Sequence, residues 1–182
     1  MSAPLKRHPK FAAGGEDLFI AVESEAGRVF AAFSDRGVSM VSPAENEDQF
    51  RATFARRTGR EVRPADSADH GDLVDALTTG DGSLIDCDLE GVSPFTRRVL
   101  DATASIERGQ TRSYQWLARQ IGMPSASRAV GNALGANPLP IIIPCHRIVR
   151  GDGSLGGYAF GPDMKQSLLE AEGALSGLTR AV

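Results

Sequence analysis

A cysteine and a histidine stand next to each other in the C-terminal half of the chain. Cys145 and His146 follow a run of three isoleucines and a proline, Ile141–Pro144. A cysteine becomes a strong nucleophile as the thiolate, and a nearby base or cation favours that form. If the isoleucine run is a strand, neighbouring side chains point to opposite faces, so a bridging water or a bend must couple the pair. The pattern indicates either a catalytic thiol or a small buried apolar residue.

An acidic residue further along the chain is a candidate partner for this pair. Residues 162–172 have the pattern of a last helix, and Glu172 lies near its end. A carboxylate is unfavourable there because the C-terminal end of a helix carries negative partial charge. Such a position suggests a specific partner, and His146 is the only histidine in this half of the chain. We therefore expect Glu172 to contact His146.

Three short helices are predicted upstream of the cysteine. Serine caps and terminal glycines place them at about residues 94–108, 114–121 and 127–134. The last two form a helix-turn-helix pattern. The third helix is built of small residues with Arg128 near its start, which suits contact with a phosphate or a groove. Tight packing of this helix against its neighbours is the alternative. Residues 150–153 predict the turn of a hairpin or wing, and residues 156–161 predict an aromatic loop that folds over a ligand.

The N-terminal half has a different pattern. Short apolar runs at residues 18–22, 29–33 and 38–41 predict an antiparallel meander. Phe50 and Phe54 lie one helical turn apart and predict an amphipathic helix on that sheet, and a second short helix is expected near residues 73–77. Residues 84–89 alternate like a half-buried strand, which gives Cys87 a structural role. The predicted fold is an α/β domain over residues 1–90 and a mostly α-helical domain over residues 91–182.

Composition and charge limit the kind of protein this is. The chain has 182 residues and a net charge of −3, with −7 in residues 1–90 and +4 in residues 91–182, so only the second half is suited to meet a polyanion. There is no apolar run of membrane-spanning length and no apolar segment after the N-terminal charges. Cys87 and Cys145 are expected to be free thiols in a reducing cytoplasm. The cysteines and histidines show no zinc-ligand spacing, and no metal or cofactor is expected.

Several motifs in residues 93–173 together resemble one family. These are S-Y-x-x-L-A, R-A-V-G-x-A, N-P-L-P-I-I-I-P-C-H-R-I-V, G-Y-A and L-L-E-x-E-G. They resemble the O6-alkylguanine-DNA alkyltransferases, also called methylated-DNA–protein-cysteine methyltransferases. Within that family, IIIPCHRIVRGDG and Phe160 are most similar to the C-terminal portion of bacterial Ada proteins, whose zinc-binding regulatory domain is not expected here. The first half is similar to the family only in its layout.

The resemblance implies an activity and a role for each matching residue. The activity is irreversible transfer of an alkyl group, typically methyl, from guanine O6 in duplex DNA to Cys145, with O4-alkylthymine as a further candidate substrate. His146 takes the thiol proton through a water, Glu172 orients His146, and Asn137 braces the turn before the active-site strand. For DNA binding it implies a recognition helix in the minor groove and extrusion of the damaged base, with roles for Ser127, Arg128, Ala129, Gly131 and Tyr114. The residues implied for the base pocket are Val149, Tyr158, Ala159 and Phe160.

The resemblance also implies a ribonuclease H-like first domain, a winged-helix second domain and a protein that acts as a monomer without a membrane. Phe160 departs from the glycine of many family members, and we predict that it narrows the pocket. Two other classes stay open from the residues themselves. One is a DNA-damage binder without transfer activity, against which the presence of Cys145 argues. The other is an unrelated cysteine hydrolase or transferase, which would leave the helix-turn-helix pattern unexplained.

Overall fold

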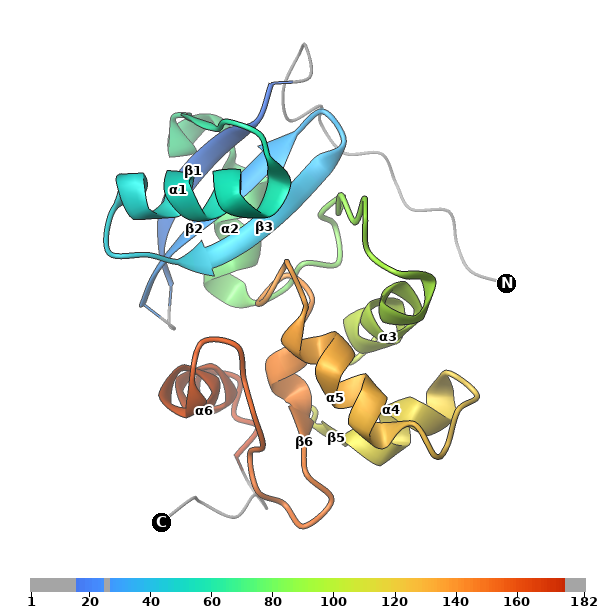
Figure 1. Ribbon diagram of the computed structural model, residues 1–182. Helices are drawn as coiled ribbons and strands as arrows, with labels where there is room; N and C mark the ends of the chain where they lie inside the picture. Colours follow the sequence, from blue (N-terminus) through green and yellow to red (C-terminus); the bar gives the residue numbers. More distant parts are fainter. Residues whose placement is uncertain (1–15, 25–26, 176–182) are drawn as a thin grey trace. The chain divides into compact units, whose positions relative to one another are not determined.

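In the computed structural model, residues 16–24 and 27–175 are described, and the chain divides between Glu90 and Gly91 into two units (Figure 1). The expectation that no apolar segment follows the N-terminal charges concerns residues that lie outside the described ranges. The two units match the broad prediction: the first is built on a sheet and the second is mostly helical.

The first unit is a four-stranded sheet with the order β3-β2-β1-β4. Strands β1 (Leu18–Ser24), β2 (Gly27–Ser34) and β3 (Gly37–Pro43) form the predicted antiparallel meander. The sequence did not predict β4 (Arg63–Pro64), which is only two residues long and pairs in parallel with β1.

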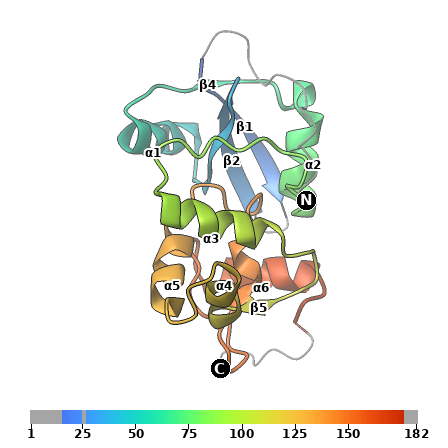
Figure 2. The same ribbon diagram turned by 90° about the vertical axis from the view of Figure 1, so that its right-hand side faces the viewer.

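Helices cover both faces of this sheet (Figure 2). The helix α1 (Glu47–Thr58) starts at Asn46, whose side chain accepts a hydrogen bond from the Gln49 amide, and ends at Gly59 in the left-handed conformation. A short helical turn, η1 (Ser67–Asp69), leads into α2 (Gly71–Thr79), which lies on the opposite face. The core under α1 is aromatic, because the Phe50 ring lies 5.3 Å from Phe19 and 5.2 Å from Phe30 between ring centroids.

The prediction of a strand over residues 84–89 is wrong about its length. Only one parallel bridge forms, between Val38 and Cys87, with hydrogen bonds from Val38 N to Asp86 O and from Asp88 N to Val38 O. The alternation was nevertheless informative, since Ile85 and Leu89 are buried. The segment crosses so close to Gly37 that a Cβ there would lie 2.4 Å from the Asp86 carbonyl oxygen.

The second unit packs three helices around a small core. The helices α3 (Pro94–Ala104), α4 (Tyr114–Gln120) and α5 (Ser127–Gly135) appear where the sequence predicted helices, with Ser93 and Ser113 as side-chain caps for the first two. The start of α5 differs from the prediction, because Ala126 occupies the cap position and provides no side-chain bond. The buried core between these helices consists of Val99, Ile106, Leu117, Ala118, Val130, Ala133, Leu134, Cys145 and Ile148.

The remaining elements carry the cysteine and close the unit. A one-turn helix η2 (Cys145–Arg147) leads into β6 (Ile148–Val149), which pairs in parallel with β5 (Arg112–Ser113), and α6 (Pro162–Ala171) follows. The predicted turn after Val149 is present, with hydrogen bonds between Arg150 and both Gly153 and Ser154. Among the described residues no strand follows this turn, so the hairpin does not form as a strand pair.

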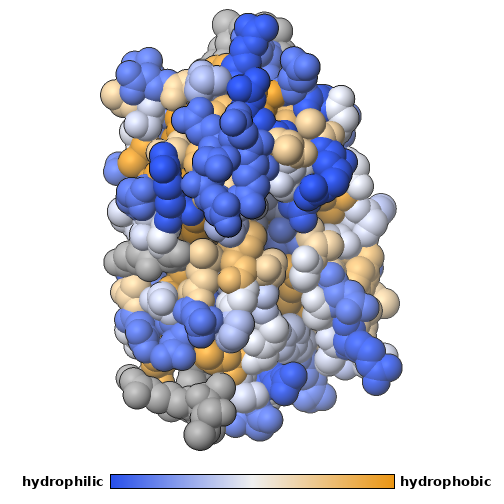
Figure 3. Space-filling model, turned by 60° about the vertical axis from the view of Figure 1, so that its left-hand side comes forward, coloured by the Kyte–Doolittle hydropathy of each residue, from blue (hydrophilic) through white to orange (hydrophobic). Residues whose placement is uncertain are grey.

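The exposed surface of the described residues is not strongly apolar. On the face drawn in Figure 3, hydrophilic and apolar residues are interspersed. Only Leu84 and Met123 are large apolar side chains with substantial exposure in the described part of the chain. Within the same residues, no helix has the length and apolar character needed to cross a membrane.

Candidate thiol site

Cys145 lies on a turn and not at the end of a strand. The prediction of an isoleucine strand is wrong, because residues 139–143 form irregular chain in which Ile141 has a positive φ of 75°. The turn closes through hydrogen bonds from Ile143 N to Leu139 O and from Cys145 N to Ile143 O. All three isoleucine side chains are buried, so their hydrophobicity anchors the turn in the core.

Asn137 holds this turn together from inside. Its side-chain oxygen accepts a hydrogen bond from Leu139 N at 3.0 Å. Its side-chain nitrogen donates to the Ile143 carbonyl at 3.0 Å and to the Cys145 sulfur at 3.2 Å. Asn137 is only 3% exposed, so these contacts satisfy a buried amide that would otherwise be costly. The position predicted as a brace therefore contacts the thiol directly.

His146 and Glu172 are in contact, as the helix-end argument predicted. The His146 Nε2 atom lies 3.0 Å from the Glu172 Oε1 atom, and both side chains are almost fully buried. Glu172 also accepts hydrogen bonds from Arg147, with Nη2 at 2.7 Å and Nε at 2.9 Å, and from the Gly109 amide at 3.2 Å. Arg147 in turn donates to the Ile106 carbonyl at 2.6 Å.

This arrangement leaves one ring nitrogen of His146 available as a base. The Nδ1 atom is buried without a hydrogen-bond partner among the described residues. If Nε2 donates to the ionised Glu172, Nδ1 carries the lone pair. Burial lowers the pKa of His146, although Glu172 opposes the shift, so the ring is neutral near pH 7. A neutral ring can accept a proton.

The resting cysteine is a thiol. Burial raises the pKa of Cys145, while the hydrogen bond from Asn137 and the charge of Lys165 act in the opposite direction. Glu172 is ionised, because the hydrogen bonds from His146 and Arg147 outweigh burial and lower its pKa to about 2.

Cys145 opens into a cavity of about 210 Å³. Tyr158 and Ala159, both predicted pocket residues, line it together with Cys145. The other lining residues are Gly131, Leu134, Gly135 and Gly157. Phe160 is not in the lining but packs edge-on against Tyr158, with ring centroids 5.6 Å apart. The hydroxyl group of Tyr158 is buried and has no hydrogen-bond partner among the described residues.

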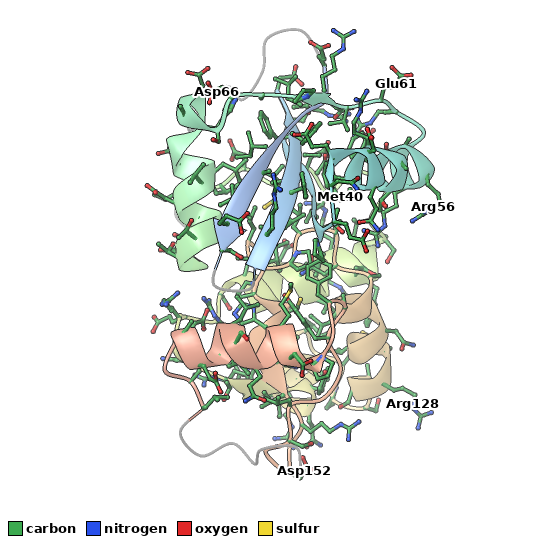
Figure 4. All side chains as sticks on the ribbon, turned by 90° about the vertical axis from the view of Figure 1, so that its left-hand side faces the viewer. Met40, Arg56, Glu61, Asp66, Arg128 and Asp152 are labelled. Carbon is green, nitrogen blue, oxygen red and sulfur yellow. The ribbon has the colours of Figure 1, made fainter. Side chains whose placement is uncertain are left out.

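Val149 and the predicted DNA-binding residues lie apart from the cavity lining, except Gly131. Val149 is buried in a separate core cluster with Leu155, Leu169 and Ala174. Ser127, Arg128 and Ala129 form the first turn of α5, where Arg128 is exposed and directed away from the ribbon (Figure 4). The Tyr114 ring lies against the backbone of Gly131 on α5, and its hydroxyl lies 3.4 Å from the Gly157 carbonyl.

The sequence arguments missed two buried cations. Arg147 stands beside His146 in the chain and could have been suspected from that position alone. Lys165 lies on α6 with its side chain fully buried, and it donates to the carbonyls of Ile148 at 2.5 Å and Gly157 at 3.2 Å. No group of His, Cys, Asp and Glu side chains in the described residues has the arrangement of a metal site.

Comparisons with known proteins show which family the chain resembles. A family model described as the DNA-binding domain of 6-O-methylguanine DNA methyltransferase matches residues 94–174. The crystal structure of Mycobacterium tuberculosis OGT in complex with DNA aligns with a TM-score of 0.69 at 32% identity, covering 87% of this chain and 94% of that one. The chain belongs to the 6-O-methylguanine DNA methyltransferase family. The resemblance seen in the sequence is thereby confirmed.

Further members of the family agree with this assignment. The enzyme from Pyrococcus kodakaraensis has the same fold, with a TM-score of 0.65 at 27% identity over 86% of this chain and 99% of that one. The Escherichia coli protein named bifunctional transcriptional activator/DNA repair enzyme Ada is 37% identical over 175 residues, which is 48% of its length. A methylated-DNA–protein-cysteine methyltransferase from Mycolicibacterium paratuberculosis is 52% identical over 88 residues, or 53% of its length. The chain thus spans about half the length of the curated relatives it matches.

Proposed function

We propose that this protein repairs O6-alkylguanine in duplex DNA by moving the alkyl group to Cys145. The observation that carries the proposal is a thiol at a cavity wall, held by Asn137 and followed by a buried His146–Glu172 pair. A thiol so placed is suited to attack a carbon atom of a ligand in the cavity, with His146 as the base. O4-alkylthymine is a second candidate substrate on the same chemistry.

The proposed alkyl transfer needs no cofactor, because each bond that forms or breaks and each proton is accounted for. The thiol proton passes through a water to Nδ1 of His146, and Glu172 stabilises the imidazolium that forms. The thiolate attacks the alkyl carbon, a carbon–sulfur bond forms, and the bond between that carbon and guanine O6 breaks. The base leaves with the electron pair and regains a proton to give guanine. Because the thioether is stable, each chain is consumed after one transfer.

The guanine must leave the base stack to reach the cavity. In this proposal α5 enters the minor groove, and Arg128 fills the gap left by the extruded nucleotide. Its exposed side chain at the first turn of the helix supports that role.

Other residues are proposed to contact the DNA backbone or the extruded base. The small side chains on α5 allow close approach to a narrow groove; they are Ser127, Ala129 and Gly131. Tyr114 crowds the target phosphate. Tyr158, Ala159 and Phe160 enclose the base, whereas the buried position of Val149 favours a supporting role.

The finer points of the fold and organisation are also proposals. The order β3-β2-β1-β4, with β4 parallel to β1, supports a ribonuclease H-like first domain. A winged-helix assignment for the second domain rests on α3, α4, α5 and the turn at residues 150–154. Among the described residues no strand follows this turn to form a paired wing. Residues 1–90 would then act as a support, and residues 91–182 as the DNA-binding and acceptor domain. Monomeric action and a cytoplasmic location are further expectations, the latter because neither Cys87 nor Cys145 is in a disulfide.

The deciding experiment follows a radiolabelled methyl group from O6-methylguanine in a duplex to the protein. We expect label on Cys145 that stops at one methyl per chain. Cys145→Ala should bind the duplex but accept no label, which makes it the matched control. Turnover beyond one methyl per chain, or transfer by Cys145→Ala, would contradict the proposal. Binding without transfer by the unaltered chain would favour the alternative of a damage binder.

A companion prediction concerns Arg128. Arg128→Ala should slow transfer from duplex DNA by about tenfold or more, because a side chain that offsets lost stacking is worth a few kcal/mol per base step. Its reaction with free O6-methylguanine should stay unchanged, since no base has to be extruded. Single-turnover rates on both substrates test this. Equal losses on duplex and free base would remove Arg128 from extrusion.

A further inference from the structure

Lys165 is unusual within this chain. The sequence contains 17 arginines and three lysines, and after Lys10 the only lysine is Lys165. Surface cations are arginines throughout the described residues, yet the one fully buried amine is a lysine. An ammonium group is a compact charge with three donors, whereas a guanidinium is a planar fork. Lys165 therefore places a compact and fully desolvated cation in the interior of the second unit.

The contacts of Lys165 leave its charge without a counter-ion. Its Nζ atom donates to the carbonyl oxygens of Ile148 and Gly157, which are neutral. In the described residues no carboxylate forms an ion pair with it. Burying an unpaired ammonium is costly, and proteins normally place a partner beside it. Its full burial in the first turn of α6 therefore requires a compensating interaction.

The position of these carbonyls points to the partner. Gly157 lines the same cavity as Cys145, and Ile148 follows Cys145 by three residues. The ammonium thus contacts the backbone of Gly157, a residue that lines the same cavity as the acceptor sulfur. Burial lowers the pKa of Lys165 to about 8, and the attraction of a Cys145 thiolate opposes that shift. The same attraction partly opposes the effect of burial, which raises the pKa of Cys145.

Other groups near the sulfur do not supply this charge. His146 is neutral in the resting protein, and Asn137 provides only a dipole. The hydroxyl groups of Tyr114 and Tyr158 have raised pKa values, because both are buried. Arg147 is bound to Glu172, and Arg150 acts on Tyr114 and Lys165 rather than on Cys145. Lys165 also disfavours protonation of His146, but that contribution is the weakest on the ring.

We propose that Lys165 is a positioning cation that stabilises the thiolate of Cys145 and so makes the acceptor reactive near neutral pH. The thiol loses its proton to His146, and the resulting negative sulfur becomes the counter-ion that the buried ammonium lacks. The inference deepens the proposed alkyl transfer, because it names what lowers the energy of the attacking form. Once the sulfur is a thioether, that counter-ion is lost.

The first test measures Cys145 ionisation without DNA. Alkylation of Cys145 by iodoacetamide is followed against pH by peptide mass spectrometry, with Cys87 as an internal reference. Lys165→Gln should move the midpoint up by about one pH unit and slow labelling at pH 7 by about tenfold. Lys165→Arg, which keeps the charge, should restore most of the shift. A Lys165→Gln midpoint equal to that of the unaltered chain, with rates reduced equally at every pH, would overturn the proposal.

The second test needs no variant and stands if Lys165→Gln fails to fold. Lysine labelled with carbon-13 gives three side-chain signals in this chain, so Lys165 can be titrated directly. Methylating Cys145 with iodomethane removes the thiol that ionises at alkaline pH, so the alkaline part of the Lys165 titration curve should move to lower pH, because coupling between two charges is reciprocal. A curve that stays the same over its whole range would overturn the proposal. Neither readout uses DNA, so a failure of methyl transfer from DNA would leave this inference intact and refute only the proposed function.

Discussion

Cys145 and His146 are so deeply buried that both are uncharged in the resting protein. Burial is the largest influence on each group, raising the pKa of the thiol and lowering that of the ring. The pair therefore differs from a preformed thiolate–imidazolium pair, and in the proposed mechanism the thiol becomes reactive when its proton moves to the ring. The groups that favour that transfer are Asn137 and Lys165 at the sulfur and Glu172 at the ring.

The ionised Glu172 should make stability depend on acid pH. Its pKa in the folded protein is about 2 against a reference value of 4.5, so its contribution is present above pH 4.5 and is lost as pH falls toward 2. Glu172→Gln should remove this dependence and lower stability at pH 7 by about 3–5 kcal/mol, because it takes away the carboxylate that faces the buried Arg147. Urea unfolding between pH 2 and pH 7 measures both effects. A variant that retains the acid slope of the unaltered chain would contradict this account.

His146 adds a separate effect at higher pH. Its pKa is lowered from 6.5, so the unfolded chain binds a proton that the folded chain does not, and stability falls as pH decreases through about 6.5. The lowered pKa values of Glu172 and His146 therefore both make the folded protein less stable as pH falls. The two pH windows are distinct, which lets one titration series separate them.

Phe160 is predicted to restrict bulky ligands. Phe160 does not line the cavity itself, so the effect on ligand size is expected to pass through Tyr158, against whose ring Phe160 packs edge-on. Phe160→Gly should raise sensitivity to inactivation by O6-benzylguanine by about tenfold or more, while methyl transfer changes little, because a pocket contact of this size discriminates by that order. Phe160→Leu, which keeps much of the bulk, is the matched control. No gain in sensitivity for Phe160→Gly would refute the pocket role.

At the scale of elements, the loop between α3 and β5 is bound to the acid of the site. Ile106 accepts a hydrogen bond from Arg147, Arg108 donates to the Ala171 carbonyl, and the Gly109 amide donates to Glu172. These contacts tie the segment that leads into α4 to the end of α6. The position of Glu172 therefore depends on three segments that are far apart in sequence.

Gly109 lies in the loop between α3 and β5 at a position that leaves little space for a side chain. Its φ is +79°, and a Cβ would lie 3.1 Å from the Glu172 carbonyl oxygen. Gly109→Ala should cost about 1–3 kcal/mol in strain and slow alkyl transfer, because Glu172 is displaced. Gly91→Ala is the matched control, since Gly91 has a φ of +76° but nothing within 4 Å of a Cβ. Denaturation and transfer rates of both variants test this, and equal behaviour would exclude a specific effect on Glu172.

The turn that carries Cys145 is a second strained element. Ile141 is a buried, β-branched residue with a φ of 75°, a conformation that costs about 1–3 kcal/mol. The three hydrogen bonds of Asn137 and the burial of the isoleucines offset this cost. Strain and support lie within the same nine residues, so the cysteine is held in one geometry.

At the scale of the whole molecule, each unit has a hydrophobic core of its own. All the proposed site residues lie in the second unit. We therefore expect a fragment of residues 91–182 to fold, because domains of this size can bury a sufficient core. It should accept one methyl group per chain from duplex DNA, with a lower melting temperature than the full chain. An unfolded fragment, or a folded one that accepts no methyl group, would show that residues 1–90 are needed for more than support.

Local patterns in the sequence determined much of the fold and the identities of the main site residues. Strand alternation, serine caps and glycine stops depend on neighbouring residues, so they predicted the meander and the positions of α1 to α6. The helix-end argument likewise predicted the contact between Glu172 and His146. The motifs around Cys145 were specific enough to indicate the family.

Tertiary structure alone decided what surrounds those residues. The apolar run before Cys145 forms a turn and not a strand, because Asn137 satisfies its backbone groups from six residues away. Arg147 and Lys165 look like ordinary surface cations in the sequence, yet folding removes both from water beside the site. Burial and charge pairing depend on which segments meet in space, and a linear pattern carries no such information. The sequence therefore determined which residues could react, and the packing around them decided their charge states.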